Sequence, residues 1–301
     1  MIRTTKLFLV FMFFIITGVS CDSESDTADN GHLRLYLTDA PVNFDDITGV
    51  YITFSEIHYH TQGNAWEVFD DFDEAVTVNL LDYTHGETML MGEFEMPPGA
   101  YTQLRFLLEA PEHGQGPPQN PECYIEFEDG TIEPLFVPSG SQSGFKAIGN
   151  FSVPANGVVD VTADFDVRRS IIKTGGSSGR YILKPTIRLV VNDQAGRIVG
   201  EVHNHPEDLG VMVYAYEADT YTEDEAADPV GEEVRFPNAA NSDMVSDDHM
   251  YHVDFLAEGM YDIVVTTTLE GDFNEVAGIV TGIEVIAEEP TYYDIDMLDL
   301  E

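Results

Sequence analysis

The sequence predicts an all-β protein built from two consecutive antiparallel β-sandwich domains. Helical periodicity is nearly absent along its 301 residues. Short segments rich in Val, Ile, Tyr, Phe and Thr are separated by clusters of Gly, Pro, Asn and Asp, a pattern typical of strands joined by turns. Many short strands of this kind predict a sandwich or a barrel.

The expected strands form two series, which meet at a polar segment, residues 192–196. Between residues 158 and 167, apolar residues alternate with Asp160, Thr162, Asp164 and Asp166, which predicts one buried face and one face in water. The first domain is expected over 31–193, with strands at 32–37, 50–59, 76–80, 100–108, 124–127, 145–153, 158–167 and 181–191. The second is expected over 196–301, with strands at 198–202, 211–216, 251–255, 261–268, 279–286 and 292–297.

Both series contain a Gly-x-Tyr segment at the start of a strand. Gly99 precedes Tyr101, and Gly259 precedes Tyr261. Glycine supplies backbone conformations that other residues resist, and a tyrosine buries its ring while its hydroxyl caps a turn. We therefore interpret both segments as structural corners of sandwich domains.

The N-terminus has the layout of a secretory signal. Arg3 and Lys6 precede an apolar run over 7–16, too short to span a bilayer, and small residues lead to Cys21. The segment resembles the lipobox of bacterial lipoproteins, in which the cysteine is lipidated and becomes the new N-terminus, although Gly18 stands where the family usually has Leu. We predict a lipoprotein signal peptide over 1–20, lipid on Cys21 and an acidic tether over 21–30 that resembles the surface-export signals of some lipoproteins.

The charge balance is strongly acidic, with 55 Asp and Glu against 13 Lys and Arg and a formal net charge of −42. Such a field repels nucleic acid and anionic lipid head groups, which excludes both as partners of the folded part. The membrane is expected as a partner only through the lipid on Cys21. If Cys21 carries lipid, Cys123 has no partner for a disulfide.

Two interpretations of the acidity remain open. A lysine-poor acidic surface keeps a protein soluble in concentrated salt, which indicates halophilic or marine adaptation. Alternatively, carboxylates converge on calcium, which would then be the cofactor of the protein. The candidate loops lack the order of an EF-hand loop and comprise 70–74 (with Asp70, Asp71 and Asp73), 219–225 and 243–248.

Histidine pairs offer a second kind of metal site. The apolar phase slips near residues 55–56, and a bulge there turns Glu56, His58 and His60 to one face, where they are candidate zinc ligands. The ordinary alternative is a solvated strand face. In the second domain, His203 and His205 form a site with the histidines of 247–252 only if the two segments meet.

Two further patterns in the sequence resemble functional sites. Residues 175–179 match the Gly-x-Ser-x-Gly motif of a nucleophile elbow. That motif works on a strand-to-helix turn, whereas here a strand follows immediately, which favours a hairpin loop. Trp66, Tyr214, Tyr216 and Tyr221 are candidate sugar-stacking residues, although core filling explains each.

Segments of the first half resemble a family of bacterial envelope domains known as domain of unknown function 4382. The segments lie at 35–41, 98–105, 138–146 with 149–151, 164–174 and 181–187. The resemblance implies a lipoprotein-anchored domain with no established activity or catalytic residues, and residues 111–121 look like an insertion. Residues 196–202 and 251–261 are similar to the prealbumin-like (transthyretin-like) sandwiches that accompany carboxypeptidases and starch-binding proteins, which implies an accessory or carbohydrate-binding-like module.

The sequence therefore predicts a non-catalytic, lipid-anchored binding or scaffolding module of the bacterial envelope, on the outer membrane and facing the periplasm or the exterior. A glycan, an envelope protein or a calcium-mediated contact is the expected partner. The alternatives are a metal-dependent hydrolase using Glu56, His58 and His60, and a purely structural spacer.

Overall fold

A computed structural model of the protein describes residues 30–40, 47–60, 65–72, 74–109, 122–137, 144–173, 180–230 and 234–300. The predicted signal peptide, Cys21, the tether up to residue 29, the insertion at 111–121, the loop at 175–179 and Asp73 lie outside these residues. Within them, no helix is long and apolar enough to cross a membrane.

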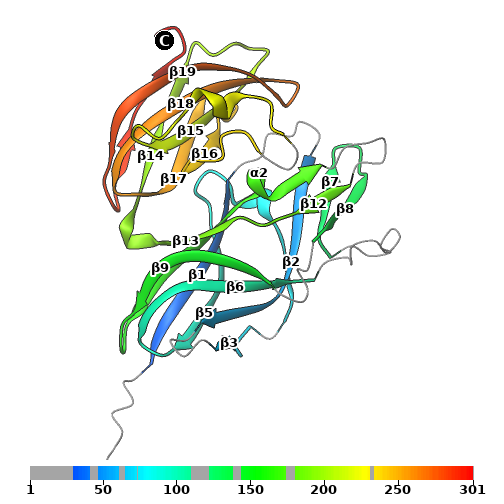
Figure 1. The fold of residues 1–301 in the computed structure, drawn as a ribbon, viewed down its shortest axis with the longest axis vertical. Helices are drawn as coiled ribbons and strands as arrows, with labels where there is room; N and C mark the ends of the chain where they lie inside the picture. Colours follow the sequence, from blue (N-terminus) through cyan, green and yellow to red (C-terminus); the bar gives the residue numbers. More distant parts are fainter. Residues whose placement is uncertain are drawn as a thin grey trace, which may run out of the picture.

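The first domain is one strongly curved, mixed sheet in the order β11-β12-β8-β7-β2-β6-β9-β13-β10-β1-β5, with β3 and β4 paired to β2 (Figure 1). Long β2 is its centre, because it pairs with four neighbours. Its elements are β1 (Gly31–Ala40), β2 (Ile47–His60), β3 (Trp66–Val68), β4 (Val76–Asn79), η1 (Leu80–Tyr83), β5 (Met89–Met96), β6 (Gly99–Leu108), β7 (Tyr124–Phe127), β8 (Ile132–Phe136), β9 (Phe145–Val153), β10 (Val158–Asp166), α2 (Val167–Ser170), β11 (Ile171–Lys173), β12 (Tyr181–Leu183) and β13 (Ile187–Val191).

The second domain is a sandwich of two four-stranded sheets, β17-β14-β20 with β21 and β16-β15-β18-β19. A short linker, η2 (Asn192–Gln194), joins it to the first domain. Its elements are β14 (Ala195–His203), β15 (Gly210–Glu217), η3 (Glu223–Ala226), β16 (Asn241–Met244), β17 (Met250–Ala257), β18 (Gly259–Leu269), β19 (Asp272–Val285), β20 (Pro290–Tyr292) and β21 (Ile295–Asp296).

Each domain buries its own apolar core. In the first, Phe54 makes edge-to-face contacts with Phe106 and Phe165, with ring centroids 5.7 and 6.3 Å apart. In the second, β15 is buried on both faces. One face fills the space between the two sheets, and the other, with Tyr214 and Tyr216, forms a separate cluster with Phe236.

The all-β prediction is confirmed, and the sheets are mixed rather than purely antiparallel. Strands β1 and β10 run parallel, as do β9 and β13, β8 and β12, and β14 with β20 and β21. Alternation within one strand sets which face is buried but not the direction of its neighbours. The sequence therefore predicts strands and faces better than their pairing.

Both predicted corners form. The hydroxyl of Tyr101 donates to the carbonyl of Pro97 at 2.7 Å, and that of Tyr261 donates to the carbonyl of Ala257 at 3.0 Å. Both rings are buried. The phase slip in β2 is also present, because its register against β6 shifts between Phe54 and Glu56.

Candidate functional site

The two domains meet through charged side chains that follow the end of β10. The Asp166 carboxylate caps α2 by accepting the N–H of Arg169 at 3.1 Å, and it pairs with the guanidinium groups of Arg168 and Arg169 at 3.1 and 3.0 Å. Held this way, Arg168 donates to the carbonyl of Phe236 at 3.5 Å, and Arg169 donates to the carbonyl of Ala239. Two arginines of the first domain thus bind the backbone of the second.

Asp164 lies beside this contact and is only 2% exposed. Arg188 approaches one of its oxygens to 2.6 Å, and the amide of Asn241, from the second domain, reaches the same oxygen at 3.4 Å. Burial raises the pKa of Asp164 despite Arg188. Burial alone would also raise the pKa of Asp166, but Arg168 and Arg169 outweigh it and hold that pKa below its usual value.

The prediction that the polar face of residues 158–167 lies in water is therefore wrong. Thr162 and Asp164 are buried rather than in water. The second domain and the linker cover them, because Thr162 donates to the side chain of linker residue Asn192 at 2.8 Å and Asp164 accepts from Asn241.

A second polar contact crosses the junction on the other side of β1. His85, on the turn after η1, lies 2.9 Å from the carboxylate of Asp243, which is fully buried in β16. The next residue, Gly86, has φ +79°, and a Cβ there would sit 2.6 Å from a carboxylate oxygen of Asp254. This close approach requires glycine. The hydrogen bond to Asp243 raises the pKa of His85, and burial raises that of Asp243.

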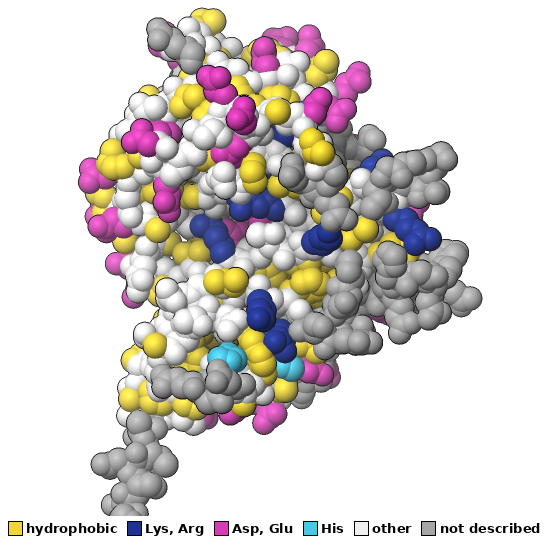
Figure 2. Space-filling view, viewed as in Figure 1, with side chains coloured by type: hydrophobic (Ala, Val, Ile, Leu, Met, Phe, Trp, Pro, Cys, Tyr) yellow, Lys and Arg dark blue, Asp and Glu magenta, His cyan; other side chains and the backbone are white. Residues whose placement is uncertain are grey.

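The charges of the two domains complement each other at this junction. Residues 196–301 contain 27 acidic and 2 basic residues, whereas residues 22–193 contain 28 acidic and 9 basic ones. Three of those nine, Arg168, Arg169 and Arg188, are placed at the junction. Figure 2 shows acidic side chains spread over the upper lobe and basic ones gathered near and below the boundary between the lobes.

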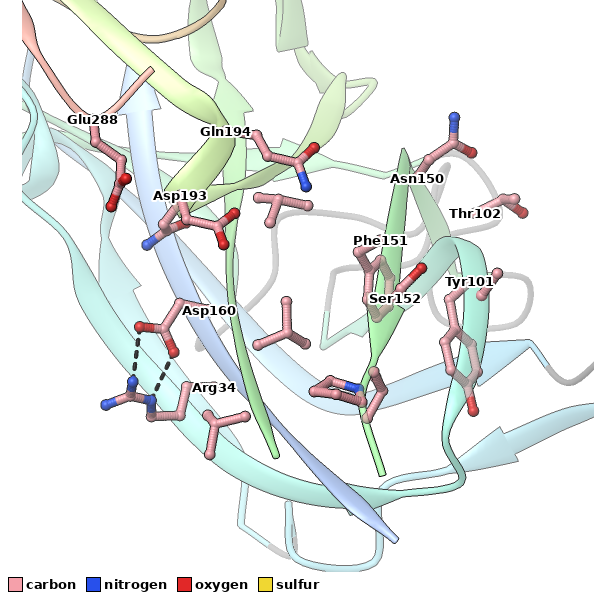
Figure 3. Close-up of a pocket in the computed structure, with 17 residues that line it drawn as sticks. Arg34, Tyr101, Thr102, Asn150, Phe151, Ser152, Asp160, Asp193, Gln194 and Glu288 are labelled. Atoms are coloured by element: carbon pink, nitrogen blue, oxygen red, sulfur yellow. Dashed lines mark hydrogen bonds and ion pairs between the residues drawn. The ribbon is translucent and has the colours of Figure 1, made fainter. Parts of the chain in front are cut away.

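An open hollow of about 770 Å³ lies beside the junction (Figure 3). The linker residues Asp193 and Gln194 and the second-domain residue Glu288 form one wall. Arg34 and Asp160 face them from β1 and β10, joined by two hydrogen bonds of 2.7 and 2.8 Å. Since this arginine is neutralised by its partner, Asp193 and Glu288 leave the hollow negative.

Strands β6 and β9 supply much of the remaining lining and add neutral polar groups, among them Asn150 and Ser152. Tyr101 and Phe151 stack on each other with ring centroids 5.3 Å apart and are 7% and 4% exposed, so they offer no flat face to a sugar. None of the 17 lining residues is His, Cys or Lys. The hollow is suited to hydrogen bonding with a neutral or cationic polar ligand, and its lining holds no paired nucleophile and base.

Comparison with known families identifies the first domain. The sequence matches the family described as Domain of unknown function (DUF4382) over residues 30–185, more than half of the chain. The chain belongs to the DUF4382 family. The junction residues Asp164, Asp166, Arg168 and Arg169 lie within the matched residues, whereas the second-domain groups that they contact, at Phe236, Ala239 and Asn241, lie outside them. Among curated proteins, none matches the sequence significantly.

Solved structures similar to the chain include bacterial pilins. The minor pilin GBS52 of Streptococcus agalactiae is 12% identical, with 87% of this chain and 94% of that chain covered and a TM-score of 0.21. The shaft pilin SpaA of Lactobacillus rhamnosus GG is 10% identical, with 89% and 96% covered and a TM-score of 0.23. Scores this low identify neither a common topology nor a common function.

The proposed zinc ligands on β2 converge only in part. Glu56 and His58 do pair, with 2.7 Å between the carboxylate and Nε2. His60 packs edge-on against Trp66 instead, with ring centroids 5.1 Å apart. In the parts of the chain described, no group of three or more His, Cys, Asp or Glu side chains is placed to hold a metal ion. Zinc at Glu56, His58 and His60 stays a prediction.

The candidate calcium loops differ in what their carboxylates contact. Asp70 and Asp71 form an exposed turn after β3. Glu225 accepts hydrogen bonds from the Tyr216 hydroxyl at 3.0 Å and from the amide of Asn238 at 3.1 Å. Asp243 belongs to the junction. Calcium binding at these loops stays a prediction.

Other side chains of the protein contact the rings of the candidate sugar-stacking residues. The guanidinium of Arg105 lies 3.9 Å from the ring centroid of Trp66. Tyr214 packs on Phe236 with centroids 4.4 Å apart, and the guanidinium of Arg168 lies 5.0 Å from the centroid of the Tyr214 ring. Tyr214 therefore fills the core, whereas Trp66 is half-buried and its ring is covered by Arg105.

The two histidine segments of the second domain do meet. His205 Nε2 and His249 Nδ1 are 2.7 Å apart. His203 instead lies 3.4 Å from Glu201 on its own strand. Cys123 is free and fully buried, and burial raises its pKa to about 12.

Proposed function

We propose that the protein is a non-catalytic scaffold of the bacterial envelope, anchored through lipid on Cys21, in which the DUF4382 domain holds the second domain in a fixed position. The contact of the Arg168 and Arg169 guanidinium groups with the backbone carbonyls of Phe236 and Ala239 carries this proposal. The side chains of Arg168 and Asp166 are 11% and 14% exposed, so each charge depends on its partner. Removing one partner of such a pair strands the other charge in a site with little water. Asp166 therefore fixes the two guanidinium groups where they meet the second domain, and the contact of His85 with the buried Asp243 is a second polar contact across the junction.

The placement of the two ends suits a spacer. Strand β1 begins at the lower pole of the molecule and the chain ends at the upper pole (Figure 1). Ala40 pairs with Asp166, beside the junction, so the 10 residues of β1 lead from the pole to the junction over about 33 Å. An anchor on the N-terminal side of Gly31 would leave the second domain far from the membrane.

A binding role is the second part of the proposal. The hollow between Arg34, Asp160 and Glu288 has the size and polarity for a small polar ligand. Its polar groups suit a glycan or a peptide segment of an envelope protein, bound through hydrogen bonds rather than aromatic stacking. A spacer without any ligand is the simpler alternative, since the rigid junction serves either role.

The opposing class is a metal-dependent hydrolase at Glu56, His58 and His60. The pairing of His60 with Trp66 disfavours it, because the third ligand is turned to another partner. Metal analysis of purified protein separates the classes. About one tightly bound zinc per chain that is lost in His58→Gln would favour the enzyme, whereas no bound zinc, or zinc that is retained in His58→Gln, would favour the scaffold.

Membrane fractionation tests the anchored part of the proposal. The full chain and its Cys21→Ser variant are expressed in a bacterium, with Cys123→Ser as the control for the loss of a thiol. We expect the wild type and Cys123→Ser to sediment with membranes and Cys21→Ser to be released. Release of the wild type, or retention of Cys21→Ser, contradicts lipid anchoring.

A further inference from the structure

We infer that His205 and His249 together form a binding site for a divalent transition-metal ion. His205 follows β14 and His249 precedes β17, so the two rings come from separate loops at the end of β14 away from the linker. His205 Nε2 lies 2.7 Å from His249 Nδ1, with ring centroids 4.6 Å apart. Two ring nitrogens thus point at each other from different parts of the chain.

The protonation of His205 follows from its second contact. Its Nδ1 lies 2.9 Å from the carbonyl oxygen of Pro206. A carbonyl only accepts, so Nδ1 carries the hydrogen, and in the neutral ring Nε2 presents a lone pair towards His249. Metal-binding histidines usually have this arrangement, in which the other ring nitrogen donates to a carbonyl or carboxylate.

His249 donates its Nδ1 hydrogen to that lone pair when no metal is present. Binding of a metal requires the other neutral tautomer of His249, with the hydrogen on Nε2, so that two lone pairs face the ion. The change moves one proton between ring nitrogens through solvent and releases none overall. It is accessible because the His249 side chain is exposed.

The backbone fixes both residues. His249 has φ +68°, and its N–H donates to the carbonyl of Ser246 at 2.9 Å, closing a tight turn. Its own carbonyl accepts the N–H of Val202 in β14 at 2.8 Å, which ties the turn to the strand that leads to His205. The two imidazoles therefore meet without a large loss of backbone freedom on binding.

The surroundings favour a cation. The pair borders a hollow of about 520 Å³ whose lining includes the carboxylates of Glu207, Asp208 and Asp247 and no Lys or Arg. Imidazole nitrogens select zinc, copper and nickel over calcium and magnesium, which bind oxygen. The histidines would thus give selectivity and the carboxylates would raise the local concentration of cations.

The distances suit a two-histidine site. Zinc lies about 2.0–2.1 Å from a histidine nitrogen, which places two such nitrogens roughly 2.9–3.4 Å apart. The observed 2.7 Å reaches that range with a small rotation of one ring. Since the described residues bring no third His, Cys, Asp or Glu to the ion, its remaining positions are open to water or to a group from another molecule.

Calorimetric titration of zinc into the mature chain carrying Cys21→Ser tests this inference. Sodium chloride at about 0.5 M suppresses diffuse condensation of cations on the acidic surface. We expect one zinc per chain, and at least tenfold weaker binding in His205→Gln and in His249→Gln. The matched control is His203→Gln, a neighbouring exposed histidine that should bind zinc within twofold of the parent, and excess calcium should not compete.

Copper provides a second readout that needs no variant. The electron paramagnetic resonance spectrum of the copper-loaded chain is expected to show superhyperfine splitting from two equivalent nitrogens. The inference is overturned if neither histidine variant weakens binding, if His203→Gln weakens it equally, or if copper shows fewer than two nitrogen ligands.

Discussion

Replacing Asp166 with Ala should destabilise the protein more than any loss of a surface charge. Asp166 caps α2 and pairs with both Arg168 and Arg169, and its side chain is 14% exposed. Removing one partner of a buried ion pair costs about 3–5 kcal/mol, because the remaining charge is left without compensation. Here the charges left behind are the two arginines that bind the second domain.

Urea unfolding at neutral pH measures this effect. Trp66, the single tryptophan, lies in the first domain and reports its unfolding by fluorescence. With a urea dependence of about 3 kcal/mol/M, a loss of 3–5 kcal/mol moves the midpoint down by roughly 1–1.7 M. The wild-type pKa of Asp166 is held below its usual value by the two arginines, so the pair is fully formed at this pH.

The control is Asp228→Ala, which removes an aspartate that also pairs with an arginine, Arg235, but is 96% exposed. Exposed pairs contribute little, so its midpoint should stay within error of the wild type. If Asp166→Ala shifts the midpoint no more than Asp228→Ala does, the junction is not held by buried charge and the reasoning is refuted.

Three further predictions concern single residues. Tyr261→Phe removes a corner hydrogen bond and should lower the free energy of unfolding by about 1 kcal/mol, whereas Tyr292→Phe, on a 78% exposed ring, should not; equal effects in urea titrations would refute the corner interpretation. Cys123 should react with Ellman's reagent only after denaturation, since burial raises its pKa to about 12, and rapid reaction of the native chain would contradict its placement. The pKa of His85 is raised by Asp243, so its stabilisation is complete below about pH 6.5 and is lost as pH rises through the folded value. His85→Gln should therefore flatten the decline in stability above that pH, and a parallel decline in wild type and variant would exclude His85 as its source.

Local features were predictable from the sequence where one segment determines its own structure. The Gly99-Ala-Tyr101 and Gly259-Met-Tyr261 corners formed as expected, because glycine geometry and a tyrosine hydroxyl act within a few residues. The register shift after Phe54 was likewise visible in the apolar phase.

Contacts between distant segments were not predictable. Asp164 occupies a polar position of an alternating strand, and nothing within that strand indicates that another domain covers it. The adjacent Arg168 and Arg169 were a missed signal, since two neighbouring arginines one residue after an Asp-Phe-Asp segment are unusual in a chain with 13 basic residues. The sequence predicts a site at His205 and His249 only if their two segments meet. The two residues are 44 positions apart in the chain, and only the fold shows that they do meet.

Nuclear magnetic relaxation of backbone amides tests the central claim, that a buried charged junction makes the two domains one rigid body. The mature chain carrying Cys21→Ser is labelled with nitrogen-15, and rotational correlation times are obtained separately for amides within 31–191 and 196–300. We predict one common correlation time, expected for a single body of this size. Two distinct and shorter times would show that the domains tumble independently, which contradicts the claim.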